Sequence, residues 1–190
     1  MRKDKHLKII HKNCGIGMHS KISVVRRMSD KKSFIWKRPI SGSRKHQEAF
    51  KKEFGKSKFW REHGLSDVKV RWHPDKKSLL KTLVQGPTLR EVLKKDHHFF
   101  SKTGNKKYKA LKKFFKLLVK SGRYIGDVSP KNIAWDGKRW QIIDSSSVRG
   151  KESKSSLKRR YKEKFTNKWS MNLNWSNKDI RLVESFIDSL

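Results

Sequence analysis

The sequence predicts an α+β chain in two lobes. The N-terminal lobe is expected to hold a five-stranded antiparallel sheet and one helix, and the reduced C-terminal lobe is expected to be mainly helical. Residues 6–40 alternate in strand fashion between short turns, and residues 44–62 change to helical periodicity. Aromatic residues make up 11% of the 190 residues, which argues against disorder because each ring buries a large apolar area.

The N-terminal half should form three strands, a helix and then two more strands. The helix covers residues 44–62, and Glu53 lies on its inward face in line with Ser57 and Trp60. A turn is expected at residues 13–17, and Gln85-Gly-Pro87 breaks the chain after the fifth strand. The expected strands cover residues 6–11, 21–25, 33–39, 68–72 and 79–84.

The C-terminal half contains clear helix signals. Thr88 and Glu91 form a capping box that opens a short helix to Lys95. Short strands are expected over residues 124–144, around a turn at residues 136 and 137. Amphipathic patterns predict further helices over residues 106–120, 156–169 and 177–190. We therefore expect a single domain over residues 1–190, with lobes at 1–84 and 89–190 and a hinge at 85–88.

Several classes of protein are disfavoured by composition. No apolar run approaches the roughly 18 residues that a membrane span needs, and the basic start of the chain lacks the apolar core of a secretory signal. The lone Cys14 excludes an intramolecular disulfide and a cysteine-based zinc site. These features predict a cytoplasmic protein without a membrane span.

The net charge of +33, from 50 Lys and Arg against 17 Asp and Glu, predicts affinity for polyanions. The expected partners are an acidic or phosphate-bearing substrate or scaffold, either RNA or a protein acceptor. Basic residues are dense over 151–168, where Arg159 and Arg160 would anchor phosphates. The alternative is a solvated basic helix that packs on Leu157, Tyr161 and Phe165.

One segment carries the pattern of a phosphotransfer site. Asp127 is followed by Asn132 at Asp-x4-Asn spacing, then by an apolar strand, a turn and a second apolar strand that ends at Asp144. Phosphoryl transfer needs an acceptor for the hydrogen bond of the substrate hydroxyl and oxygen ligands for Mg²⁺. A hairpin between Asn132 and Asp144 would bring two such ligands together.

This segment resembles the catalytic loop and metal-binding Asp of protein kinases. The upstream half matches too, since Gly15-Ile-Gly17-Met-His-Ser20 resembles the glycine-rich loop and Phe34-Ile-Trp-Lys37 the lysine-bearing strand. The chain is most similar to small atypical members of the protein-kinase-like superfamily, the RIO kinases and the lipopolysaccharide-core (Kdo/heptose) kinases. Ser129 and the absence of Phe-Gly after Asp144 are both RIO-like features.

The resemblance implies a role for each motif residue. Asp127 would orient the acceptor hydroxyl, Asn132 and Asp144 would bind Mg²⁺, and Lys37, paired with Glu53, would contact the phosphates of ATP. The remaining nucleotide-binding residues would be Gly15, Gly17, Ser20 and Val84.

The expected function is an ATP- and Mg²⁺-dependent kinase that phosphorylates a hydroxyl of a protein Ser/Thr or of a sugar. The alternative is a pseudokinase that binds a nucleotide, RNA or a protein, because Ile125-Gly126 replaces the usual His-Arg. A nucleic-acid-binding structural protein is a third reading, and it depends on charge alone.

Overall fold

The computed structural model describes residues 7–17, 20–126, 128–144, 147–169 and 173–190 of an α+β chain. The chain divides into two compact units. The N-terminal unit comprises Met1–Phe59 and Val68–Leu83, and the C-terminal unit comprises Trp60–Asp67 and Val84–Leu190. The N-terminal unit ends at Leu83, one residue before the expected end of the first lobe at residue 84, and Trp60–Asp67 falls in the C-terminal unit.

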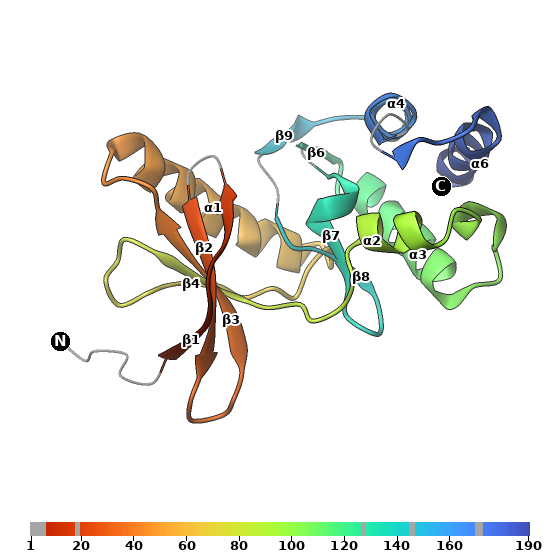
Figure 1. The fold of residues 1–190 in the computed structure, drawn as a ribbon. Helices are drawn as coiled ribbons and strands as arrows, with labels where there is room; N and C mark the ends of the chain where they lie inside the picture. The colour runs from red at the N-terminus through yellow and green to blue at the C-terminus, as the bar shows by residue number, and fades with distance from the viewer. Residues whose placement is uncertain (1–6, 18–19, 127, 145–146, 170–172) are drawn as a thin grey trace. The chain divides into compact units, whose positions relative to one another are not determined.

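The N-terminal unit contains a five-stranded antiparallel sheet with the strand order β1-β2-β3-β5-β4 (Figure 1). Helix α1, Arg44–Glu62, follows β3 and lies against this sheet, and its last three residues belong to the C-terminal unit. The strands are β1 Leu7–Gly17, β2 Ser20–Arg27, β3 Ser33–Pro39, β4 Val70–Trp72 and β5 Leu79–Thr82.

The turn predicted at residues 13–17 is wrong, because this segment belongs to β1. Gly15 pairs with Ile22 and Gly17 pairs with Ser20, so the ladder between β1 and β2 continues to the end of β1. The register shifts between Ile9 and His11 and again between His11 and Gly15. Such irregularities accommodate extra residues in one strand without ending the pairing, so the glycines did not require a turn.

The C-terminal unit combines helices with two small β elements. The helices are α2 Leu89–Lys95, α3 Lys106–Lys120, α4 Lys154–Glu163 and α6 Asn177–Asp188. The short helical segments are η1 Phe99–Ser101, η2 Pro130–Asn132 and the π-helical η3 Lys164–Trp169. The strands form two antiparallel pairs, β6 Arg123–Gly126 with β9 Ser147–Lys151 and β7 Ile133–Trp135 with β8 Trp140–Ile142.

An aromatic cluster around Phe115 of α3 forms the centre of the C-terminal unit. The Phe115 ring lies 5.0 Å from Phe165, 5.7 Å from Phe186 and 6.2 Å from Tyr161, measured between centroids. All four side chains are buried. The cluster therefore joins α3, α4, η3 and α6, and the stripe of Leu157, Tyr161 and Phe165 expected under the basic helix is confirmed.

Strand β9 and the break in the helix predicted over 156–169 were not expected from the sequence. Strand β9 has a single apolar residue, Val148, so it lacks the alternation that marks a half-buried strand. The predicted helix begins earlier, at Lys154, with Ser153 as its cap, and changes to π-helix at Lys164. In contrast, the capping box of Thr88 and Glu91 is present as predicted.

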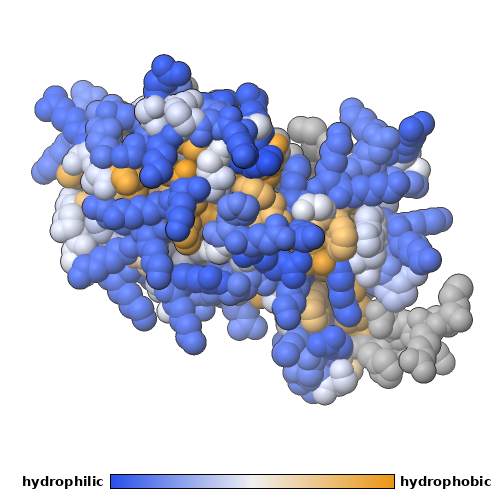
Figure 2. All heavy atoms as spheres, turned by 180° about the vertical axis from the view of Figure 1, so that it is seen from behind, coloured by the Kyte–Doolittle hydropathy of each residue, from blue (hydrophilic) through white to orange (hydrophobic). Residues whose placement is uncertain are grey.

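The surface is strongly hydrophilic on the face drawn in Figure 2, where apolar residues show only in small areas between polar ones. Within the described part of the chain, no helix combines the length and the apolar character needed to cross a bilayer.

Candidate functional site

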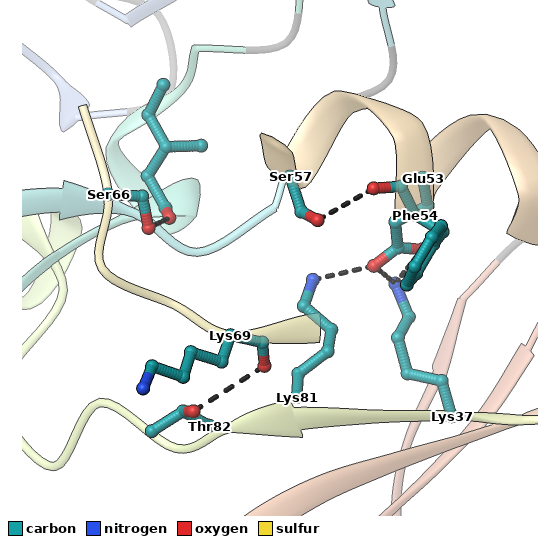
Figure 3. Close-up of polar contacts among 9 residues, drawn as sticks. Lys37, Glu53, Phe54, Ser57, Ser66, Lys69, Lys81 and Thr82 are labelled. Carbon is teal, nitrogen blue, oxygen red and sulfur yellow. Dashed lines mark hydrogen bonds and ion pairs between the residues drawn. The ribbon is translucent and has the colours of Figure 1, made fainter. Parts of the chain in front are cut away.

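Three charged side chains meet inside the N-terminal unit. Lys37 Nζ donates hydrogen bonds to both carboxylate oxygens of Glu53, at 3.1 Å to Oε1 and 2.9 Å to Oε2. Lys81 Nζ donates to the same Oε1 at 2.6 Å. Figure 3 shows the two lysines reaching from the sheet to Glu53 on α1. Only 6% of Lys37, 8% of Glu53 and 4% of Lys81 is exposed, so this Lys-Glu-Lys cluster is buried.

Strand register puts the two lysines on one face of the sheet. In the antiparallel pair of β3 and β5, Lys37 lies opposite Leu79 and Ile35 lies opposite Lys81. Residues two apart on a strand share a face, so Lys37 and Lys81 are diagonal neighbours on the same side. The cluster therefore follows from the pairing of two adjacent strands.

Helix α1 supplies Glu53 from its buried stripe. Phe50, Ser57 and Trp60 follow helical spacing around Glu53, and all three are buried. Glu53 is therefore on the inward face, as the sequence predicted. Phe54 is 40% exposed, so the apolar stripe lies on the Phe50 and Trp60 side.

The two ammonium groups determine the ionisation of Glu53. Burial raises the pKa of this carboxyl, but the charges of Lys81 and Lys37 and their hydrogen bonds lower it more, from 4.5 to about 2. Glu53 is therefore a carboxylate at neutral pH. Removing one partner of a buried ion pair is strongly destabilising, because it leaves a charge without compensation.

Lys81 is the site residue that sequence reasoning missed. It follows Leu79 and Leu80 on β5, and both leucines are fully buried. A lysine that shares the face of a buried Leu79 needs a buried anion, since lysine is almost never buried unpaired. The position of Lys81 two residues after Leu79 was therefore the signal that the sequence offered for a buried lysine.

The C-terminal unit holds the predicted metal ligands on a hairpin. Strands β7 and β8 pair in register from Ile133 with Ile142 to Trp135 with Trp140. Beyond this pairing, the Ile143 N–H donates to the Asn132 carbonyl at 2.9 Å. Asn132 and Asp144 therefore lie at the same end of the hairpin, one residue out of register, as the sequence predicted.

Asp127 lies outside the described residues, whereas the strand before it is well anchored. Gly126 pairs with Ser147, so β6, which precedes Asp127, is joined to β9, which follows Asp144. The Ile125 N–H donates to the buried hydroxyl of Tyr161 on α4 at 3.2 Å. Burial raises the pKa of Tyr161, and the ring stays neutral. Helix α4 thus supports the strand that leads into the predicted catalytic loop.

Ser129 lies in the same loop and has an unusual hydroxyl. Its Oγ is buried, and among the described residues it has no hydrogen-bond partner. Buried polar atoms are nearly always paired, so an orphan of this kind fits a site that takes an oxygen-rich ligand. No group of three or more His, Cys, Asp or Glu residues is placed to hold a metal within the described ranges.

The predicted nucleotide-binding residues are distributed over both units. Gly15, Gly17 and Ser20 lie where β1 pairs with β2, and Ser20 is buried. Val84 is half-buried at the start of the C-terminal unit. Next to it, an added Cβ on Gly86 would lie 1.6 Å from the Trp135 carbonyl oxygen, so the predicted hinge packs tightly on β7.

Arg160, one of the two predicted anchors, has partners within the chain. Its Nη1 donates to Glu152 at 2.5 Å, and its guanidinium lies 3.9 Å from the centre of the Tyr124 ring. Arg159 is exposed. Only Arg159 of this pair is therefore positioned as a surface cation.

No protein-family model matches the chain, and no curated protein is significantly similar to it.

Proposed function

We propose that the protein is an ATP- and Mg²⁺-dependent phosphotransferase with a protein-kinase-like fold, and that its acceptor is a hydroxyl of a protein Ser/Thr or of a sugar. The observation that carries this proposal is the buried ion pair between Lys37 on β3 and Glu53 on α1. A lysine held in this way is pre-organised to bind phosphate, because its ammonium group is fixed and desolvated.

The hairpin of the C-terminal unit adds independent support. Asn132 and Asp144 offer an amide and a carboxylate oxygen at one end of β7 and β8, and Mg²⁺ prefers oxygen ligands of this kind. When bound, Mg²⁺ would neutralise charge on the phosphates. The Ser129 hydroxyl, which has no hydrogen-bond partner among the described residues, could donate a hydrogen bond to a phosphate oxygen.

The remaining role in phosphate transfer is assigned to Asp127. Asp127 would accept a hydrogen bond from the acceptor hydroxyl and orient it for attack. Its position in the chain follows β6, whose backbone is held by Tyr161 and by β9. Oriented attack depends on a fixed backbone around the reacting groups, and β6 supplies one such backbone.

Radiolabelled ATP tests this function directly. The wild type should transfer labelled phosphate to an acceptor in a cell lysate in the presence of Mg²⁺ and not in its absence. Asp127→Ala should abolish transfer while it retains nucleotide binding. Nucleotide binding without transfer by the wild type would favour the pseudokinase, and no nucleotide binding would overturn both readings.

A further inference from the structure

Lys81 shares the carboxylate that holds Lys37. Glu53 Oε1 accepts hydrogen bonds from both lysines, and the bond from Lys81 is the shorter, at 2.6 Å against 3.1 Å. Glu53 Oε2 accepts from Lys37 at 2.9 Å. Glu53 therefore keeps a charged partner if either lysine turns away.

This redundancy matters for a lysine that binds phosphate. If Lys37 were the only partner of Glu53, turning its ammonium group towards a phosphate would weaken the compensation of a buried carboxylate. Lys81 prevents this loss of charge compensation, because its hydrogen bond to Glu53 Oε1 does not involve Lys37. The Lys37 ammonium group is then available to an anion without loss of the contact between α1 and the sheet.

We propose that Lys81 is a second lysine of the phosphate-binding site, a positioning residue that holds Glu53 so that Lys37 can bind a phosphate of the nucleotide. This inference rests on the proposed function for the identity of the ligand. The sharing of Glu53 rests only on the three side chains themselves.

The position of Lys81 suits this role. It stands on β5, the neighbour of β3 in the sheet, and its side chain rises from the same face as that of Lys37 (Figure 3). Glu53 thus accepts hydrogen bonds from side chains of two adjacent strands. If one lysine no longer bonds to Glu53, the other still attaches α1 to the sheet.

A stability cycle tests the sharing without any nucleotide. We would measure urea midpoints for Lys37→Met, Lys81→Met and the double variant. The double variant should lose more than the sum of the two single losses, because only there is Glu53 left without either lysine. Glu53→Gln should recover part of the loss in the double background, since it removes the buried charge. Additive midpoint shifts would show that the lysines do not share Glu53.

Ligand titration tests the phosphate-binding role. Mg-ATP and, separately, tripolyphosphate would be titrated calorimetrically into the wild type, Lys81→Met and Lys81→Arg. Lys81→Met should weaken both ligands by about tenfold, the effect of losing one hydrogen bond to a charged group. Lys81→Arg should recover most of the affinity. Lys69→Met, which removes an exposed lysine of the same unit, is the matched control and should bind as the wild type does.

The outcomes separate this inference from the proposed function. If the wild type binds Mg-ATP and Lys81→Met binds it equally well, the role of Lys81 is wrong and the proposed function stands. If the wild type binds neither ligand, the phosphate-binding role and the proposed function both fail, whereas the stability cycle still decides whether Glu53 is shared.

Discussion

Glu53 is a buried carboxylate that attaches helix α1 to the sheet through Lys37 and Lys81. Lys37 and Lys81 keep it ionised, with a pKa of about 2 in the folded chain against 4.5 ordinarily. The folded state therefore binds its proton less readily than the unfolded state does. Such a group stabilises the fold above its unfolded pKa, and the stabilisation is lost as the pH falls through the folded pKa.

Acid should weaken the fold through this residue. We expect Glu53 to contribute on the order of 3 kcal/mol above about pH 4.5, and this contribution should disappear as the pH falls towards 2. Urea unfolding at several pH values would measure it, and Glu53→Gln should flatten that part of the profile. Glu48→Gln removes an exposed carboxylate from the same helix and should leave the profile unchanged.

Lys37→Met should abolish phosphotransfer while the protein stays folded. The reason is chemical, since methionine fills the same space but offers no charge to a phosphate. Folding should survive because Lys81 still pairs with Glu53 at 2.6 Å. Labelled phosphate transfer and circular dichroism would measure the two properties. A Lys37→Met protein that transfers phosphate at the normal rate would contradict the role assigned to Lys37.

Single residues were predictable from sequence where a pattern constrained them. The Lys37 and Glu53 pair was expected from the resemblance to the lysine-bearing strand of protein kinases, with helical spacing placing Glu53 on the inward face, and the structure contains that ion pair. Lys81 was missed because the sequence alone does not fix which residues of β3 and β5 lie opposite each other. The buried Tyr161 hydroxyl was expected only as part of an apolar stripe, so its hydrogen bond to Ile125 was missed.

The β7 and β8 hairpin is the element that makes neighbours of the two residues beside it. Asn132 and Asp144 flank the hairpin in sequence, and the hydrogen bond from Ile143 to the Asn132 carbonyl places their backbones at one end of it. Tight pairing over only three residue pairs is sufficient, because Trp135 and Trp140 pack together at the other end, with ring centroids 5.4 Å apart.

Asp144→Asn should weaken Mg²⁺-dependent nucleotide binding by at least about tenfold, a typical effect of perturbing a metal site. Asp127→Asn should weaken it much less, because Asp127 is assigned to the acceptor hydroxyl. Calorimetry with ATP in the presence and absence of Mg²⁺ would measure both variants. Wild-type affinity for Mg-ATP in both variants would contradict the assigned roles.

The segment before α2, residues 85–88, has no room for a side chain at Gly86. A Cβ there would lie 1.6 Å from the Trp135 carbonyl oxygen and 2.7 Å from its carbon. The Trp135 N–H also donates to the Pro87 carbonyl at 2.9 Å, so the two backbones cannot separate without losing a hydrogen bond.

Gly86→Ala should lower the free energy of unfolding by about 3 kcal/mol or more, the upper end of the usual cost of overpacking. Gly55→Ala is the contrasting control. Gly55 lies on an exposed part of α1 with nothing within 4 Å of an added Cβ, so alanine there should stabilise by about 0.5–1 kcal/mol. Urea unfolding would measure both, and equal stability of the two variants would contradict this account.

Helices were predictable from the sequence where an apolar periodicity extends over several turns. Strands were not predictable where their limits depend on pairing with another strand. Helices α1 and α3 begin and end as expected, because each repeats an apolar stripe over several turns. Strand β9 depends on β6, a partner distant in sequence that no local pattern encodes. The extension of β1 to Gly17 depends on its neighbour β2, and the ladder reaches Gly17 only after two register shifts that the residue pattern does not reveal.

At the scale of the whole molecule, the charge of +33 must repel itself unless an anion binds. Some of its cations already serve the fold. Arg160 pairs with Glu152 and lies over Tyr124, and Arg27 pairs with Asp30. The polyanion-binding capacity therefore belongs to the exposed cations, of which Arg159 on α4 is one.

Reversing these two neighbouring charges should have different effects. Arg159→Glu should weaken RNA binding and lower the salt slope by about 0.7 for a lost contact to single-stranded RNA, while stability stays unchanged. Arg160→Glu should lower stability, because it opposes Glu152. RNA and acidic-peptide binding across a salt series, with urea unfolding, would measure both. An unchanged slope for Arg159→Glu would mean that this part of the helix is only solvated surface.

Residues 60–67, at the end of α1 and directly after it, determine where the chain can be divided into fragments. Leu65 accepts a hydrogen bond from the Ile142 N–H, and Ser66 Oγ donates to the Ile142 carbonyl at 2.8 Å. The Asp67 N–H donates to Gln141 Oε1 at 2.7 Å. A fragment that starts at residue 84 would therefore expose the open edge of β8, and unpaired edges recruit other chains. Separate production of the C-terminal unit requires that residues 60–67 be grafted onto it, for example by circular permutation, since no single cleavage point releases it intact.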